Sequence, residues 1–445
     1  MKKGRMLSLW VAALAATVAL AMPACAGKTS AKSGVTLYGA LNCPYVSTEG
    51  GRVYLQLSVA APEITRPERR PMNLAVVLDR SGSMGAEGKM ENAKAAVRAL
   101  INQLRPEDYV SIVIYDDVVE VLRNSARVRD KAALRRLVDE IYPRGWTNLG
   151  GGMIEGFRQA EMNAREGFVN RVVLLSDGLA NRGITSPRRL REIARDYRSE
   201  AITLTTIGVG WEFNENLMVG LSESGGGNYY FLESPRDLAS VFQKEFDLIT
   251  ELVAANVVIE LELNATVRVT DVIGYEYSAE KDRCAIHVGD LYGSESREIT
   301  VELTVPPGRG SRKLLTAAFS RSSRSRLGNP TYAAVVEYTV ESEEIEEHRD
   351  MAVQADADVA VSTRLVDRAM DALDEGKEEE AAEALRDARK QLGASPAASV
   401  AGAAGEEIKE QQGRLEEYER ELKKGKDKAK KSIQYDNYRT KKKKK

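Results

Sequence analysis

The sequence has little histidine and little cysteine, and these shortages exclude several classes of enzyme. Among 445 residues there are two histidines, His287 and His348, and three cysteines. A catalytic zinc site takes three protein ligands, mostly histidine or cysteine, and the sequence shows no such set. A Ser-His-Asp triad needs a histidine beside its serine, and neither histidine is placed for that by its sequence context. We interpret both histidines as structural or surface groups.

Two further absences narrow the possible functions. The chain lacks the G-x-x-x-x-G-K-[ST] motif, so ATP hydrolysis of the P-loop type is not expected. After the N-terminal segment, no apolar run is long enough to cross a membrane as a helix. The formal net charge is −2, which gives no overall attraction to nucleic acid or acidic lipid. Together these absences favour a binding protein over an enzyme.

The N-terminus carries the pattern of an export signal. Lys2, Lys3 and Arg5 form a basic start, and an apolar, alanine-rich stretch follows over residues 7–22. Ala24-Cys25-Ala26 fits the small-residue cleavage pattern, which predicts a signal peptide over residues 1–26. In an alternative interpretation Cys25 is the lipidated cysteine of a lipoprotein. Either way we expect an exported protein of the periplasm, cell envelope or extracellular space, which in the second interpretation is anchored by a lipid.

The chain is long enough for two or three domains, and its middle part alternates strand and helix patterns. Residues 73–253 begin with the buried-strand pattern of residues 73–78, which the helical periodicity of residues 89–104 follows. Further strands and helices take turns up to residue 253. This alternation predicts an α/β domain with a doubly wound, mostly parallel, Rossmann-like sheet.

A second domain of antiparallel strands is predicted after residue 253, where the hydrophobic period changes to two. Residues 254–341 contain several such runs with glycine and proline between them, which indicates a β-sandwich. Strand-like residues 34–72 are expected to complete this sandwich, so the α/β domain would be an insertion in it. Cys43 and Cys284 would then either form one disulfide or remain two buried thiols.

The C-terminal part has a helical pattern over residues 351–428. One helical hairpin is expected to turn at Glu375-Gly376-Lys377, and a single such unit does not make a solenoid. Residues 429–445 are rich in lysine and are predicted to be a disordered tail. Such a tail is usually solvated, although it could make weak contact with anionic lipid or polymer.

Three oxygen-bearing side chains follow the first strand of the α/β domain. Asp79, Ser81 and Ser83 form a D-x-S-x-S pattern directly after the strand at residues 73–78. Ligands of open α/β sheets bind at the carboxyl ends of the strands. Mg²⁺ prefers oxygen ligands and keeps part of its water shell, so the pattern predicts a divalent-cation site. Taken alone, the same residues could merely cap the following helix.

Two later stretches complete a known arrangement. Thr147 lies in a glycine-rich loop over residues 145–152, and Asp177 follows a buried strand over residues 171–176. A D-x-S-x-S pattern, a loop threonine and an aspartate after a strand, in this order, make residues 73–248 resemble the von Willebrand factor A (VWA) domain. The family's metal-ion-dependent adhesion site (MIDAS) uses these three parts.

The resemblance implies a role for each of these residues. Ser81 and Ser83 would bind Mg²⁺ or Mn²⁺ directly, and Asp79 would act through water or through one of its oxygens and hold the loop. Thr147 would lie on a loop that moves when ligand binds, and Asp177 would hold metal-bound water. One coordination position would remain for an acidic residue of a protein partner. Among neighbouring residues, Asp116 and Asp117 could lie at the rim, and Trp146 is expected to pack on its own domain rather than contact a partner.

The leading hypothesis is an exported binding protein whose metal site engages an exposed Asp or Glu of a protein partner in adhesion or complex assembly. The alternative is a cell-envelope scaffold in which the C-terminal helices make the main contacts and the metal is structural. A hydrolase is a distant third. A phosphatase of the haloacid dehalogenase type needs a second acid two residues after Asp79, and Ser81 stands there instead. We therefore do not expect an enzyme.

Overall fold

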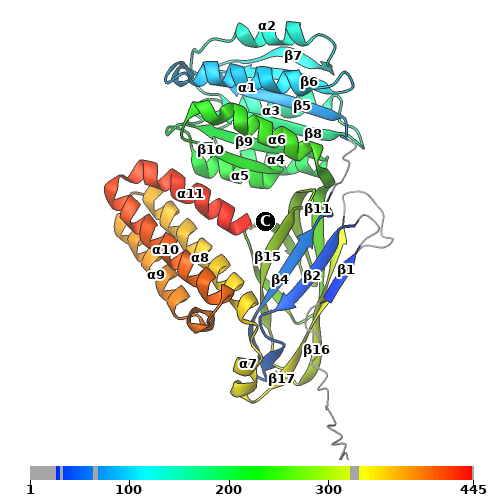
Figure 1. The fold of residues 1–445 in the computed structure, drawn as a ribbon, viewed down its shortest axis with the longest axis vertical. Coiled ribbons are helices and arrows are strands. Elements are labelled where there is room, and N and C mark those ends of the chain that lie inside the picture. Colours follow the sequence, from blue (N-terminus) through cyan, green and yellow to red (C-terminus); the bar gives the residue numbers. More distant parts are fainter. Residues whose placement is uncertain (1–26, 31–33, 64–68, 321–329, 443–445) are drawn as a thin grey trace, which may run out of the picture.

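The structure is a computed structural model, and it describes residues 27–30, 34–63, 69–320 and 330–442. The predicted signal peptide with Cys25 lies outside the described residues. An α/β domain sits on one side of a β-sandwich, and a helical region lies beside both (Figure 1). In the described ranges, no helix combines the length and apolar character needed to cross a membrane. This mixed architecture confirms the predicted fold class.

The α/β domain is built on a six-stranded sheet in the order β10-β9-β8-β5-β6-β7, in which only β7 is antiparallel. Every residue of β5, β8 and β9 is buried, because helices cover both faces of the sheet. The strands are β5 (Met72–Asp79), β6 (Tyr109–Tyr115), β7 (Val119–Arg127), β8 (Val169–Ser176), β9 (Ile202–Val209) and β10 (Gly226–Leu232).

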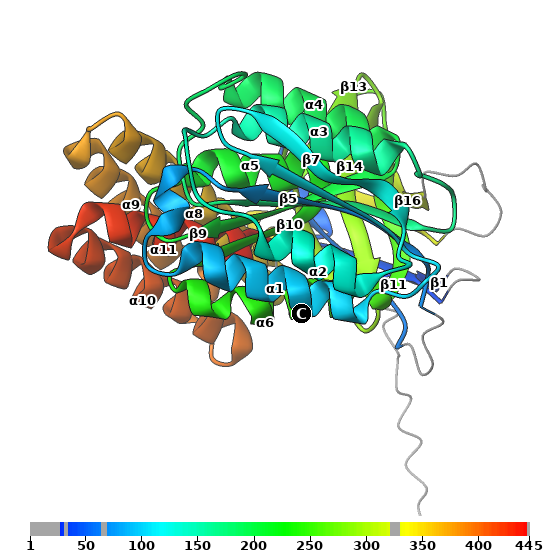
Figure 2. The same cartoon turned by 90° about the horizontal axis from the view of Figure 1, so that it is seen from above.

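Six helices form the outer layers of this domain, three on each face of the sheet (Figure 2). One face is covered by α1 (Lys89–Gln103), α2 (Lys131–Asp139) and α6 (Leu238–Thr250). The other is covered by α3 (Leu149–Glu161), α4 (Pro187–Ser199) and α5 (Glu215–Gly225). Short 3₁₀ turns, η1 (Gly82–Gly85) and η2 (Pro235–Asp237), precede α1 and α6. Part of the predicted glycine loop is therefore helix, since α3 begins at Leu149.

Two of these glycines allow α3 to pack closely. A Cβ atom on Gly150 would lie 2.4 Å from the carbonyl oxygen of Ile184, and one on Gly152 would lie 2.4 Å from the ring of Tyr115. Real Cβ atoms do not approach so closely, so the helix could not sit here with larger residues. The glycine run thus positions the start of α3, directly after Thr147, against the end of the sheet.

The β-sandwich consists of two sheets that enclose one apolar core. The first has the order β1-β2-β4-β15-β12, formed by Gly27–Ser30, Thr36–Leu41, Gly51–Ala60, Ser296–Val305 and Arg268–Ile273. The second has the order β13-β14-β11-β16-β17-β3, formed by Glu276–Glu280, Arg283–Tyr292, Leu252–Leu263, Gly310–Ser320, Thr331–Thr339 and Tyr45–Ser47. Neighbouring strands are antiparallel except β17 and β3. Since β4 and β15 pair along their length, the α/β domain is inserted into the sandwich.

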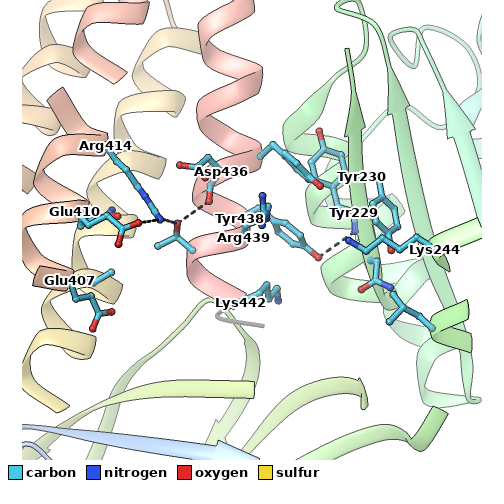
Figure 3. A pocket seen from close by; sticks show the side chains of 16 residues that line it. Tyr229, Tyr230, Lys244, Glu407, Glu410, Arg414, Asp436, Tyr438, Arg439 and Lys442 are labelled. Atoms are coloured by element: carbon cyan, nitrogen blue, oxygen red, sulfur yellow. Dashed lines mark hydrogen bonds and ion pairs between the residues drawn. The ribbon is translucent and has the colours of Figure 1, made fainter. Parts of the chain in front are cut away.

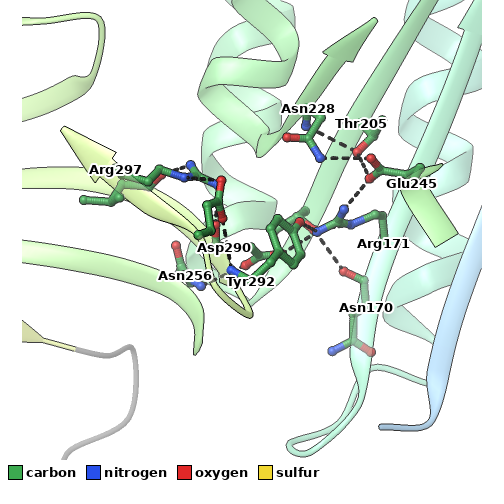
Figure 4. A network of polar contacts seen from close by, with 12 residues as sticks. Asn170, Arg171, Thr205, Asn228, Glu245, Asn256, Asp290, Tyr292 and Arg297 are labelled. Atoms are coloured by element: carbon green, nitrogen blue, oxygen red, sulfur yellow. Dashed lines mark hydrogen bonds and ion pairs between the residues drawn. The ribbon is translucent and has the colours of Figure 1, made fainter. Parts of the chain in front are cut away.

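A buried arginine ties the two domains together (Figure 4). Arg171 on β8 is fully buried and forms ion pairs with Glu245 of α6 and Asp290 of β14. Its guanidinium also donates to the hydroxyl of Tyr292 at 2.9 Å. Glu245 receives a further hydrogen bond from Asn228, so both carboxylates and the arginine are satisfied. We call Arg171, Glu245 and Asp290 the interdomain clamp.

The helical region packs against the sandwich through its longest helix. It comprises α7 (Ser342–Glu347), α8 (Met351–Asp374), α9 (Glu378–Gly393), η3 (Pro396–Ser399), α10 (Ala403–Lys424) and α11 (Lys426–Lys442). Ala357 and Val361 of α8 are buried with Tyr54 and Ile273 of the sandwich. The turn between α8 and α9 is held at Gly376, whose φ of 75° suits glycine.

The lysine-rich C-terminus differs from its prediction, because α11 continues to Lys442 where a disordered tail was expected. Lys431 donates to Glu215 at 2.6 Å, and Lys441 forms an ion pair with Asp367 at 2.5 Å. The ring of Tyr438 is buried, and its hydroxyl accepts the backbone N–H of Tyr229, on the edge strand β10, at 3.3 Å. The helix thus packs against the α/β domain on one side and against α8 on the other. A lysine-rich composition predicts a solvated segment, but here acids far away in the sequence neutralise the lysine charges.

A cavity of about 570 Å³ lies where α11 and α10 face β10 and α6 (Figure 3). Lys244, Arg414 and Arg439 line it, together with Glu410 and Asp436. Arg414 is already engaged by Glu410 at 2.6 Å. Of the five residues predicted to bind metal, none lines this cavity.

The two remaining cysteines are buried and are not joined. Cys284 is a free thiol on β14, in the core of the sandwich, and burial raises its pKa to about 11. The Sγ atom of Cys43 instead donates to the carbonyl oxygen of Ile345 at 3.3 Å. Within the described ranges the disulfide alternative is therefore wrong.

Candidate metal site

Asp79 is fixed at the carboxyl end of the central strand β5. Its side chain is fully buried. Oδ1 accepts the backbone N–H of Ser81 at 2.8 Å, and Oδ2 accepts the hydroxyl of Ser176 at 2.8 Å. Each carboxylate oxygen therefore has a defined partner, and the first of them shapes the loop that follows the strand.

The two serines of the D-x-S-x-S pattern come together in that loop. The hydroxyl oxygens of Ser81 and Ser83 lie 3.1 Å apart. Ser83 also donates to Oδ1 of Asp177 at 2.8 Å, which joins the loop after β5 to the loop after β8. Ser81 is buried, whereas Ser83 is partly exposed, so the cluster opens to solvent on the Ser83 side. The structure thus brings together residues 94 positions apart.

Thr147 borders the same space from a third loop. A Cβ atom on Gly178 would lie 3.2 Å from the hydroxyl of Thr147 and 3.7 Å from that of Ser83. The loop that carries Thr147 is held to the first loop by two backbone hydrogen bonds, from Gly82 to Gly145 at 3.1 Å and from Arg144 to Arg80 at 2.7 Å. All five predicted residues therefore lie at one end of the sheet.

Asp177 has a partner that the sequence did not point to. Nζ of Lys89, the first residue of α1, donates to Oδ2 of Asp177 at 2.8 Å. Both side chains are buried, with 5% and 0% of their area exposed. A lysine in the first turn of a helix opposes the helix dipole, and this anomaly was the available signal for a functional contact. Ser176, which holds Asp79, gave no such signal.

The oxygens of the cluster are hydrogen-bonded to one another, and a small divalent cation accommodates ligand oxygens at similar separations. In an octahedral Mg²⁺ site with bonds of 2.0–2.1 Å, neighbouring ligand oxygens lie about 2.9 Å apart. The Ser81–Ser83 and Ser83–Asp177 separations are 3.1 and 2.8 Å. In the described part of the chain, no group of three or more His, Cys, Asp or Glu side chains could hold a metal. A cation here would therefore depend on hydroxyl ligands, which two carboxylates support.

Burial controls the charge of the cluster. Removal from water, followed by the charge of Asp177, raises the pKa of Asp79 from 3.8 to about 6, although hydrogen bonds from Ser81 and Ser176 oppose this. Two ionised carboxylates in one buried site are costly without a nearby cation. Lys89 supplies one positive charge, and a divalent ion would supply the rest.

The neighbouring acids have different roles. Asp116 is buried and pairs with Arg80 at 2.8 Å and Arg144 at 2.7 Å, so it supports the loops instead of facing a partner. Asp117 lies at the rim, where its Oδ2 accepts the backbone N–H of Trp146 at 3.1 Å. The expectation that Trp146 packs on its own domain is wrong, since 57% of its area is exposed. His287 on β14 and His348 after α7 both lie outside the α/β domain.

Comparisons with known proteins agree with this geometry. The family model described as "von Willebrand factor type A domain" matches residues 73–244. The uncharacterized protein YfbK of Escherichia coli (strain K12) is 30% identical over 260 residues, which cover 57% of this chain and 45% of that protein. The uncharacterized protein sll0103 of Synechocystis is 28% identical over 210 residues, which cover 47% and 49%. The chain spans about half the length of these relatives.

Two solved structures resemble the chain beyond this domain. A von Willebrand factor type A structure from Catenulispora acidiphila has a TM-score of 0.65 at 17% identity and covers 80% of this chain and 86% of its own. The ArnB paralog VWA2 from Sulfolobus acidocaldarius has a TM-score of 0.59 at 18% identity, with coverage of 91% and 98%. At such identities the likeness shows the fold alone. The chain therefore contains a von Willebrand factor type A domain, which spans residues 73–244.

Proposed function

We propose that the chain is an exported binding protein that uses a divalent cation at its A domain to hold an acidic group of a protein partner. The observation that carries this proposal is the cluster of Asp79, Ser81, Ser83 and Asp177, in which the Ser83 hydroxyl lies 3.1 Å from that of Ser81 and 2.8 Å from a carboxylate oxygen of Asp177. A domains are in general protein-interaction modules, which agrees with it. The export part rests on the signal pattern of residues 1–26.

Each residue of the cluster would have a different role at the cation. Ser81 and Ser83 would hold the cation through neutral hydroxyls, with Thr147 beside them. The cation supplies a Lewis-acidic position that takes an incoming carboxylate. Asp79 orders the loop through the Ser81 N–H, and Asp177 holds the Ser83 hydroxyl. Since the nearest ligands are neutral, the cation keeps more of its charge for the partner.

The alternative scaffold role gains no support from the C-terminal helices. Lys431, Tyr438 and Lys442 of α11 are buried inside the molecule. The lysines also have acidic partners within the chain, such as Glu215 and Glu223. These contacts leave the described part of the lysine-rich segment little charge for lipid or for another protein.

Calorimetric titration of Mg²⁺ and Mn²⁺ into the chelator-treated chain tests the proposal. We expect saturable binding that Asp79→Ala abolishes and that Asp196→Ala, an exposed aspartate on α4, leaves unchanged. A melting curve of each variant shows whether it is folded. Equal binding by the Asp79→Ala variant would contradict the proposed site, as would a wild-type chain that takes up neither ion.

A further inference from the structure

Large apolar side chains gather on the loops around the candidate site. Among the described residues, ten large hydrophobic side chains are exposed. Five of them lie on the three loops that follow β6, precede α3 and follow β8, and we call these five the rim: Val118, Tyr142, Trp146, Leu179 and Ile184. The other five are scattered over the rest of the molecule. Exposed hydrophobic residues that occur singly need no explanation, but a group around a polar site does.

Hydrogen bonds and a ring contact tie the three loops into one surface. Backbone N–H groups of Asn181 and Arg182, after β8, donate to the carbonyl oxygen of Thr147 at 3.2 and 3.3 Å. Trp146 N–H donates to Asp117, in the loop after β6, at 3.1 Å. The guanidinium carbon of Arg182 lies 5.5 Å from the centroid of the Trp146 ring. Because these bonds hold the loops in place, little conformational entropy would be lost in ordering them when a partner binds.

The residue types on this surface are those that dominate binding energy elsewhere. Trp146 and Tyr142 expose 57% of their area each. Each is stacked by an arginine, Arg182 over Trp146 and Arg144 over Tyr142 at 5.7 Å. Tryptophan, tyrosine and arginine are enriched among the hot spots of protein interfaces. Beside these arginines more than half of each side chain stays exposed, and this area is available to a partner.

The net charge of the site determines which charge the contacting group of the partner should carry. Asp79 and Asp177 are negative and Lys89 is positive, so the buried cluster holds one net negative charge when Asp79 is ionised. A divalent cation would change this to one net positive charge. At the rim, Arg144 and Arg182 are about half exposed, with 47% and 57% of their side-chain area accessible. Asp116 pairs with Arg144 at 2.7 Å and Asp117 with Arg182 at 3.7 Å, so these loops are close to neutral and the divalent cation would supply the attraction for an anionic group.

We infer that the rim docks a segment of a protein partner in which an Asp or Glu has an aromatic or large aliphatic neighbour. The carboxylate would reach the cation, and the apolar neighbour would cover Trp146 and Leu179. This inference rests on the proposed function, since the acid needs the metal. It goes further by stating which side chains must accompany the acid. A partner that offers an acidic residue without an apolar neighbour would reach the cation but leave the five rim side chains exposed.

Panning of random phage-displayed peptides on the full chain with Mn²⁺ tests the inference without knowledge of the partner. We expect the enriched peptides to combine an Asp or Glu with an aromatic or large aliphatic residue beside it. The same selection on Asp79→Ala should lose the acidic residue from its consensus. Enriched peptides without an acid would overturn the proposed function itself. Enriched peptides with acids in polar surroundings would overturn only the present inference.

A synthetic copy of the enriched peptide then measures the contribution of the rim. We expect Trp146→Ser to weaken its binding at least about tenfold, as for a hot-spot residue. Met162→Ser, which changes an equally exposed side chain outside the rim, should leave binding unchanged. Mn²⁺ affinity should be the same in both variants, which shows that the metal site is intact. Equal peptide affinity in the two variants, failure to enrich any peptide over Asp79→Ala, or a Mn²⁺-dependent dimer that buries the rim would overturn the inference.

Discussion

Asp79 makes the stability of the metal-free protein depend on pH. Its folded-state pKa of about 6 lies above the ordinary 3.8, so its contribution to stability is present below the lower value and is lost as pH rises through the higher one. A metal ion binds the ionised form and reverses this loss. We therefore expect Mg²⁺ to raise the melting temperature more at about pH 7.5 than at about pH 5.

Thermal melts at both pH values, with and without Mg²⁺, check this expectation. In Asp79→Asn the side chain carries no charge at either pH, so the effect of Mg²⁺ should become small at both. A shift of the same size at the two pH values in the wild-type chain would contradict the expectation.

Lys89 is expected to affect both the stability of the fold and, at the proposed site, the affinity for metal. Lys89→Met leaves the buried Asp177 without its ion pair, which should cost about 3–5 kcal/mol of metal-free stability. The same change removes a cation from beside the site. The repulsion between the Lys89 ammonium and a nearby Mg²⁺ exceeds ~1.4 kcal/mol at an effective dielectric constant of about 20. Without it, Mg²⁺ should bind the Lys89→Met variant at least about tenfold more tightly than the wild-type chain. Calorimetry and denaturant unfolding measure the two effects.

Two further variants control the Lys89 experiment. Lys94→Met changes a lysine on the same helix that pairs with the exposed Glu91, so it should alter neither quantity much. Lys89→Met combined with Asp177→Asn removes both charges and should recover most of the lost stability. Weaker Mg²⁺ binding in a folded Lys89→Met variant would show that the ammonium does not compete with the ion.

The sequence predicted which residues meet at the site for a simple physical reason. Asp79 and Asp177 each follow a buried parallel strand, and such strands end at one edge of a sheet. In the structure β5 and β8 are neighbours, so the two loops meet. Lys89 was missed because its place in the first turn of a helix marks it as unusual, but only the packing of α1 on the sheet shows that Asp177 is its partner. Trp146 was misjudged because burial is a property of the surrounding loops and not of the residue type.

At the scale of elements, α11 is held by polar contacts to several other elements, and those of Lys431 are among the most buried. Lys431 donates to Glu215 at 2.6 Å and to the carbonyl oxygen of Phe213 at 2.5 Å, and it lies 4.4 Å from the Phe213 ring centroid. Lys431→Met should cost ~1–3 kcal/mol, since Lys430 still neutralises Glu215 at 2.9 Å. Chemical denaturation measures this loss. Lys423→Met, an exposed position on α10, should be nearly neutral, and an equal cost in both variants would refute the account.

The error in predicting α11 shows where sequence reasoning fails for elements. Strands β5 and β8 carry their own signal, because each contains an unbroken apolar run, residues 74–78 and 172–175. In α11 the buried residues Ile433 and Tyr438 are separated by polar ones, and lysine dominates the composition. The acids that neutralise these lysines, Glu215 and Asp367, come from α5 and α8. Long-range partners of this kind cannot be read from a composition window.

For the whole molecule, the interdomain clamp should decide how firmly the A domain is held. Arg171→Met leaves Glu245 and Asp290 buried without their cation, which should cost about 3–5 kcal/mol. Arg171→Lys keeps the charge but cannot reach both acids with a planar fork, so it should lie in between. Calorimetric melts compare these variants with Arg195→Met, which breaks an exposed pair with Glu276 and should cost under about 1 kcal/mol. Similar melting of the Arg171→Met and Arg195→Met variants would refute the role of the clamp.

The insertion of one domain into another also has a mechanical consequence. The chain enters the A domain at the start of β5 and leaves it where α6 gives way to β11, so both connections lie at the end of the sheet opposite the Asp79 cluster (Figure 1). Tension between a captured partner and the sandwich would therefore run along the parallel strands and load the hydrogen bonds between β5, β6 and β8 in shear. Bonds loaded in shear must break together, whereas bonds that are peeled open break singly. The A domain is thus built as a stiff coupling along the line on which a partner would pull.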